Sequence, residues 1–118
     1  MERVVGIGGV FFKARQPEKL AEWYRQHLGI EVEASFGGAT FAATGPTVWS
    51  PFPESSTHFA SPLMINYRVA SLEKMLAQLR AAGAPVEDNT QDSEFGKFGW
   101  ATDLEGNRFE LWEPPPQP

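Results

Sequence analysis

The stretch DLEGNRFELWEP, residues 103–114, decides the fold, because a glycine-containing turn leads directly into a strand that ends in Trp-Glu-Pro. An earlier stretch, TVWSP at residues 47–51, ends in a similar way. Two helix openings also resemble each other, QPEK at residues 16–19 and SLEK at residues 71–74. Because similar segments recur in the same order, the sequence predicts a duplicated unit.

Each helix opening begins an amphipathic run that a glycine closes. Pro17 suits the first position of one helix, and Gly29 supplies its left-handed C-cap. Ser71 is a good N-cap for the other helix, which ends at Gly83. The expected apolar stripes are Leu20, Ala21, Tyr24 and Leu28 in the first helix, and Leu72, Met75, Leu76 and Leu79 in the second.

Strand-like runs surround both helices, so each half reads as βαβββ and the fold class is α+β. Gly6–Ala14 precedes the first helix. The runs after the helices are Ile30–Ser35, Thr40–Thr44 and Pro46–Ser50 in the first half, and Pro85–Asp88, Phe98–Thr102 and Asn107–Trp112 in the second. We expect a single domain over 1–118, made of a first unit at 4–51, a linker at 52–62, a second unit at 63–114 and a proline-rich tail at 115–118. The second unit is the longer one, around Asn89–Lys97, which is either a lid or a surface excursion without a role.

Composition excludes several classes of function. The 118 residues are 42% hydrophobic, enough for one compact domain whose stability can depend on pairing with a second copy. A net charge of −5 argues against nucleic-acid and anionic-membrane partners, and the absence of cysteine excludes disulfides and thiolate chemistry. Glu2 and Lys13 bound an apolar stretch too short for a signal peptide or membrane span, so we expect a cytoplasmic protein.

With its two βαβββ units and the stretches QPEKLAEWYRQHLGIEV and DLEGNRFELWEP, the chain resembles the vicinal oxygen chelate superfamily. This superfamily includes glyoxalase I, bleomycin-resistance proteins and extradiol dioxygenases. The resemblance covers residues 4–114 and implies a curved mixed sheet that encloses a cavity, often at or near a homodimer interface. It specifies fold more closely than function, because the superfamily contains metal-dependent enzymes beside proteins that only sequester a drug.

The resemblance also implies four metal-ligand positions, which fall on Gly9, Thr47, Met64 and Glu110. Of these, Glu110 alone matches the usual ligand types, so the sequence predicts no metal and no cofactor. The alternative is a divalent metal at a rearranged site made of Glu110 and His58, which lies in the linker.

Strand alternation relative to Glu110 identifies the side chains that face the expected cavity. The predicted ligand-binding residues are Phe11, Lys13, Thr47, Trp49, Met64, Asn66, Arg68, Arg108 and Trp112. The residues expected to pack under the helices instead are Val10, Phe12, Val48, Ile65, Tyr67, Phe109 and Leu111. Lys13 and Arg68 occupy matching positions in the two units. At this position the resemblance to glyoxalase I implies a basic residue that binds a substrate carboxylate, and the alternative is a salt bridge to Glu110. Trp49 and Trp112 either enclose a ligand or fill the barrel mouth as core residues.

Our leading hypothesis is a metal-free homodimer that binds a small organic molecule, anionic or aromatic, in the sheet cavity. In it, Phe11, Trp49 and Trp112 enclose the ligand, while Asn66 and Arg68 orient it. The second hypothesis is a lyase, isomerase or oxygenase of the glyoxalase type, with Glu110 as a catalytic base or metal ligand. A purely structural or regulatory dimer is the third.

Overall fold

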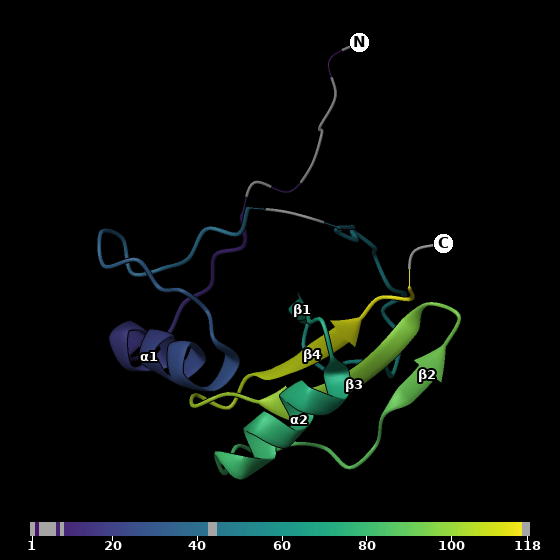
Figure 1. Ribbon diagram of the computed structural model, residues 1–118. Helices are drawn as coiled ribbons and strands as arrows, with labels where there is room; N and C mark the ends of the chain where they lie inside the picture. The colour runs from purple at the N-terminus through teal and green to yellow at the C-terminus, as the bar shows by residue number, and fades with distance from the viewer. Residues whose placement is uncertain (1, 3–6, 8, 43–44, 117–118) are drawn as a thin grey trace.

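The computed structural model describes residues 2, 7, 9–42 and 45–116, which form two helices and four strands (Figure 1). The elements are α1 (Pro17–Leu28), β1 (Asn66–Arg68), α2 (Leu72–Ala81), β2 (Gln91–Ser93), β3 (Gly96–Thr102) and β4 (Arg108–Glu113). These elements confirm the α+β class.

Both helices begin and end where the sequence predicts. Helix α1 has Pro17 in its first turn, and Gly29 follows it with a φ of 70°, in the left-handed region that favours glycine. The hydroxyl of Ser71 accepts a hydrogen bond from the backbone N–H of Lys74 and caps α2. Gly83, with a φ of 80°, lies just beyond the last turn of α2.

The four strands form one mixed sheet in the order β1-β4-β3-β2. Strand β4 pairs in parallel with β1 and antiparallel with β3, and β3 pairs antiparallel with β2. In this register Glu110 lies between Asn66 on one neighbouring strand and Trp100 on the other. The centre of the sheet is therefore the place where the second unit brings its polar side chains together.

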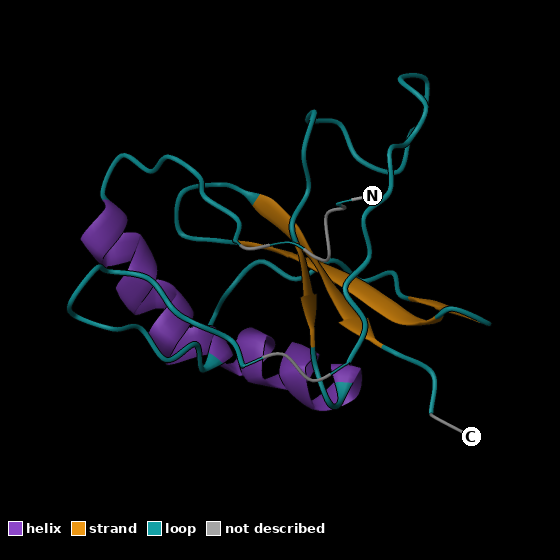
Figure 2. Cartoon of the chain, turned by 90° about the horizontal axis from the view of Figure 1, so that it is seen from above, coloured by secondary structure: helices purple, strands orange, loops and turns teal. Residues whose placement is uncertain are grey.

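The hydrophobic core lies between the two helices and one face of the sheet (Figure 2). On β4, Phe109 and Leu111 point toward the helices and are 2% and 0% exposed. The ring of Phe109 packs against Tyr24 of α1 and Tyr67 of β1. Phe109, Leu111 and Tyr67 thus take the core side that alternation predicts for them.

Asp103 begins the turn between β3 and β4 and is buried, with 5% of its surface exposed. Its carboxylate accepts a 2.8 Å hydrogen bond from the hydroxyl of Tyr24 on α1. The same carboxylate accepts hydrogen bonds from the backbone N–H groups of Glu105 and Asn107. The side-chain amide of Asn107 also donates to both carboxylate oxygens. The turn is therefore closed around one buried side chain that also binds the helix of the first half.

Glu105, in the same turn, accepts the backbone N–H groups of Arg15 and Gln16 at 2.8 and 2.9 Å. These donors hold the pKa of the Glu105 carboxyl below its usual value. Because both backbone groups lie at the start of α1, the turn joins the two halves at a second point.

The first half differs from the sequence prediction. The strands expected over Gly6–Ala14, Ile30–Ser35, Thr40–Thr44 and Pro46–Ser50 form no regular strand in the described residues, where Glu33 and Gly38 make one isolated bridge. Gly6, Gly8, Ala43 and Thr44 lie outside the described residues. A strand is stabilised by the ladder it forms with a neighbour, and all four places in this sheet belong to the second half.

As a result, large apolar side chains of the first half are in contact with solvent. Phe11 is 92% exposed and Trp49 is 79% exposed. The other strongly exposed apolar residues of this half are Ile7, Val10, Phe12, Phe36, Phe41 and Val48. Val10, Phe12 and Val48 therefore do not pack under the helices as predicted.

The segment Asn89–Lys97 forms a hairpin at the edge of the sheet. It contains β2 and the start of β3, joined by a turn at Glu94 and Phe95. The strand expected over Pro85–Asp88 is reduced to an isolated bridge between Val86 and Ala101. In the described part of the chain, neither helix has the length and apolar character required to cross a bilayer.

Candidate functional site

The candidate site lies on the sheet face that the helices leave uncovered. Residues that are directly paired across strands point to the same side, so the register defines this face. The residues that share it with Glu110 are Asn66, Arg68, Phe98, Trp100, Thr102, Arg108 and Trp112.

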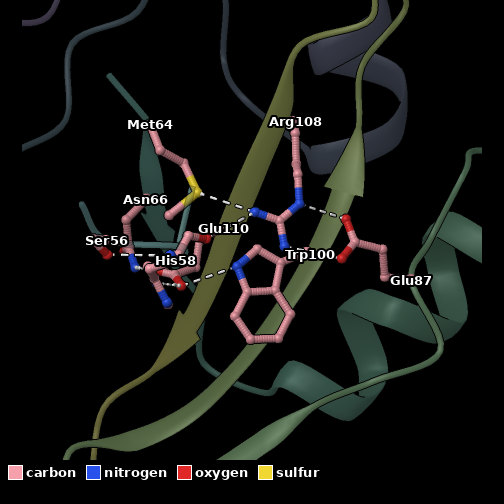
Figure 3. Close-up of polar contacts among 8 residues, drawn as sticks. All are labelled: Ser56, His58, Met64, Asn66, Glu87, Trp100, Arg108 and Glu110. Atoms are coloured by element: carbon pink, nitrogen blue, oxygen red, sulfur yellow. Dashed lines mark hydrogen bonds and ion pairs between the residues drawn. The ribbon is translucent and has the colours of Figure 1, made fainter. Parts of the chain in front are cut away.

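Glu110 is at the centre of the face and is 5% exposed. One of its oxygens, Oε1, accepts a 2.8 Å hydrogen bond from the side-chain amide of Asn66. The other oxygen, Oε2, accepts a 3.0 Å hydrogen bond from the indole N–H of Trp100 and lies 3.0 Å from Nε2 of His58 (Figure 3). A buried carboxylate is costly unless donors replace water, and here Asn66 and Trp100 donate to it while His58 lies within hydrogen-bond distance.

His58 reaches Glu110 from the segment that precedes β1. Its backbone N–H donates to the hydroxyl of Ser56, which holds the bend of the chain. Its imidazole stacks on Phe52, with ring centres 5.5 Å apart and planes at 16°, and meets Phe59 and Trp100 edge-on. The ring is therefore fixed in orientation although 29% of the side chain is exposed.

Arg108 packs against the ring of Trp100. Its guanidinium lies 5.3 Å from the centre of the indole ring, a cation–π arrangement, and donates two hydrogen bonds to the carboxylate of Glu87. The ion pair lowers the pKa of Glu87 below its usual value. Weaker contacts join Arg108 to Sδ of Met64 and to the carbonyl of His58 (Figure 3).

Arg68 and Trp112 extend the face toward the β2–β3 hairpin. Arg68 donates to the backbone carbonyl of Pro46, and Trp112 donates to the carbonyl of Phe95 at 2.8 Å. Trp112 also stacks on Phe98, with ring centres 6.2 Å apart and planes at 14°. The hairpin tip is thus held against the site by a hydrogen bond from the Trp112 side chain to the backbone of Phe95.

The structure brings together part of the predicted set. Met64, Asn66, Arg108 and Glu110 belong to one connected cluster, and Arg68 and Trp112 share its sheet face. The four predicted residues of the first half, namely Phe11, Lys13, Thr47 and Trp49, are exposed on segments that pair with no strand of the sheet. They form no part of the cluster around Glu110 in the described chain.

The sequence prediction omitted Trp100, Glu87 and Phe52, and assigned His58 only to an alternative metal site. Trp100 could have been found, because an antiparallel hairpin around Gly106 places it opposite Glu110. His58 and Glu87 carry no such signal, because both lie on irregular segments outside the strands.

The donor set does not fit a metal ion. Among the described residues, no group of three or more His, Cys, Asp or Glu side chains could hold one. Glu110 and His58 provide two ligands at most, and the Glu110 oxygens already accept hydrogen bonds from Asn66 and Trp100.

Comparisons with known proteins agree with this architecture. The model of a family described as glyoxalase-like domain matches residues 9–112. TnmS3, described as an antibiotic binding protein from Streptomyces sp. CB03234, is similar in structure, with a TM-score of 0.54 and 18% identity over 86% of this chain and 88% of that chain. TioX from Micromonospora sp. ML1 has a TM-score of 0.50 and 14% identity over 84% of this chain and 90% of that chain. At these identities the likeness shows the fold alone, and no curated protein matches the sequence.

Proposed function

We propose that this chain, which belongs to the glyoxalase-like domain family, binds a small, partly aromatic organic molecule on the sheet face around Glu110. The observation that carries the proposal is the buried Glu110 carboxylate with its ordered donors, set among the rings of Trp100, Trp112 and Phe52. Aromatic walls with a few fixed polar groups are typical of small-molecule sites. TnmS3, which shares the fold, is described as binding an antibiotic, so a drug-sized ligand is compatible with this architecture.

The proposal is tested by titrating the protein with a panel of aromatic antibiotics and metabolites while tryptophan fluorescence is recorded. We expect at least one compound to quench the emission with a Kd of about 1 μM to 1 mM, the range of moderate small-molecule affinity. Trp112→Phe should reduce the amplitude of the response. Trp23→Phe is the matched control, because Trp23 packs on the helix side of the sheet against Phe109 and should leave the response intact. If no compound in the panel changes the emission, the proposal fails.

We propose further that binding requires no metal. Glu110 is poorly suited to bind a metal ion or to act as a catalytic base, because its two oxygens already face Asn66, Trp100 and His58. Elemental analysis of the purified protein tests this point directly. A stoichiometric transition metal that is lost in Glu110→Gln would favour the alternative of a lyase, isomerase or oxygenase.

We also propose that two copies pair through the first half of the chain. Support comes from the apolar side chains that this half exposes, among them Phe11 and Trp49, since large exposed apolar patches mark interaction sites. Pairing would give the first-half segments the strand partners that they lack within the described chain. Light scattering should give a mass about twice the 13.1 kDa of one chain, and a monomer at all concentrations would contradict this part of the proposal.

A further inference from the structure

His58 has a ring nitrogen that the cluster around Glu110 does not use. Nε2 faces Oε2 of Glu110 at 3.0 Å, whereas Nδ1 has no hydrogen-bond partner among the described residues. No side-chain nitrogen or oxygen of the described residues is both buried and unpaired, so Nδ1 of this partly exposed residue is open to solvent. The free nitrogen is therefore available to a ligand on the proposed binding face.

The neighbours of Glu110 determine which nitrogen of His58 carries the proton. The indole of Trp100 and the amide nitrogen of Asn66 can only donate, so both oxygens of Glu110 act as acceptors. Because both Glu110 oxygens act as acceptors, we take Nε2 of His58 to supply the hydrogen in its contact with Oε2. A neutral imidazole with its proton on Nε2 has a lone pair on Nδ1, which then accepts hydrogen bonds.

The surroundings of Nδ1 select the kind of group that would donate to it. The ring is bounded by Phe52, Phe59 and Trp100, so the partner must present its donor beside apolar, aromatic surface. The negative charge of Glu110 on the far side of the imidazole disfavours an anion here. Both nearby cations are engaged, Arg108 with Glu87 and Arg68 with the carbonyl of Pro46.

We propose that His58, oriented by Glu110, is the specificity-determining residue of the site and that its Nδ1 accepts a hydrogen bond from a phenolic hydroxyl on a neutral aromatic ligand. This inference rests on the proposed function and adds to it a ligand class. Glu110 then acts as a positioning residue, because it fixes the tautomer and direction of the imidazole without contacting the ligand.

The first test compares 2-naphthol with 2-methoxynaphthalene, which has the same rings but no hydroxyl proton. By calorimetry at about pH 8, the wild type should bind 2-naphthol about three- to tenfold more tightly, the effect of one neutral hydrogen bond. His58→Phe keeps an aromatic ring on Phe52 and removes both nitrogens, so it should bind the two probes equally. His27→Phe, which changes the other histidine at its position on α1, should keep the preference.

The second test needs no variant. In ¹⁵N spectra of the histidine side chains, His58 should show its proton on Nε2, and 2-naphthol should shift the Nδ1 resonance while 2-methoxynaphthalene should not. A proton on Nδ1 overturns the inference, as does a preference for 2-naphthol that survives in His58→Phe. Equal binding of both probes by the wild type overturns the role of His58 but leaves the proposed binding function supported. Failure of both probes to bind overturns the ligand class, and the broader panel then tests the function separately.

Discussion

Replacing Asp103 by alanine is expected to lower the free energy of unfolding by about 3–5 kcal/mol. The carboxylate is buried and accepts the Tyr24 hydroxyl, two backbone N–H groups of its own turn and the Asn107 amide. Alanine would remove the acceptor of the Tyr24 hydroxyl, which is buried among the core residues and would be left with its interaction with Tyr67. It would also open the turn that holds β4 in register with β3.

The effect is measured by urea denaturation followed by circular dichroism. Asp88→Ala is the matched control, because Asp88 is exposed before β2 and its removal should change stability by no more than about 0.5 kcal/mol. Tyr24→Phe should cost about 1–2 kcal/mol in the wild type and much less once Asp103 is alanine, because the two side chains share one hydrogen bond. An Asp103→Ala protein that is as stable as its control would contradict the role assigned to the turn.

The sequence predicted the features of this fold that depend on neighbouring residues. The ends of α1 and α2 follow from Pro17, Gly29 and Ser71, whose effects act within one turn of the backbone. The division of β4 into a core side with Phe109 and a site side with Glu110 follows from the alternation of a single strand. Neither prediction requires knowledge of what the element packs against.

Features that depend on distant partners were predicted less well. A run such as Pro46–Ser50 has strand-like composition, but a strand forms only where a neighbour offers its backbone groups, and the described chain offers none there. The contact of His58 with Glu110 joins residues 52 positions apart through an irregular segment, and no periodicity encodes it. Trp100 is intermediate, because its place opposite Glu110 follows from the hairpin register once the turn at Gly106 is recognised.

The core and the site therefore use the same strand in different ways. Phe109 and Leu111 stabilise the fold through apolar burial, whereas Glu110 between them requires three hydrogen-bond donors to be tolerated at the same depth. A leucine in place of Glu110 could be buried without a desolvation cost, but it would leave the N–H of Trp100 without an acceptor. A carboxylate at this position is thus explained by what it orders on the open face and not by the stability of the sheet.

Replacing Glu110 by alanine is expected to lower the free energy of unfolding by about 2–4 kcal/mol and to weaken binding of the best panel compound by about 10- to 100-fold. The indole N–H of Trp100, which is 4% exposed, would lose its acceptor, and His58 and Asn66 would lose the group that orients them. Denaturation and fluorescence titration of the same protein measure the two effects.

Glu110→Gln separates hydrogen bonding from charge. The glutamine carbonyl can accept from Trp100, and its amide can donate to Asn66 once the Asn66 amide turns over, so stability should stay within about 1 kcal/mol of the wild type. Glu94→Ala, at the exposed turn of the β2–β3 hairpin, controls for the loss of a carboxylate in general. If Glu110→Ala matched this control in both stability and binding, Glu110 would not organise the site. If Glu110→Gln bound the ligand as weakly as Glu110→Ala, the negative charge of Glu110 would be essential for binding. Glutamine preserves the acceptor for Trp100, but it lacks the charge that holds the proton on Nε2 of His58.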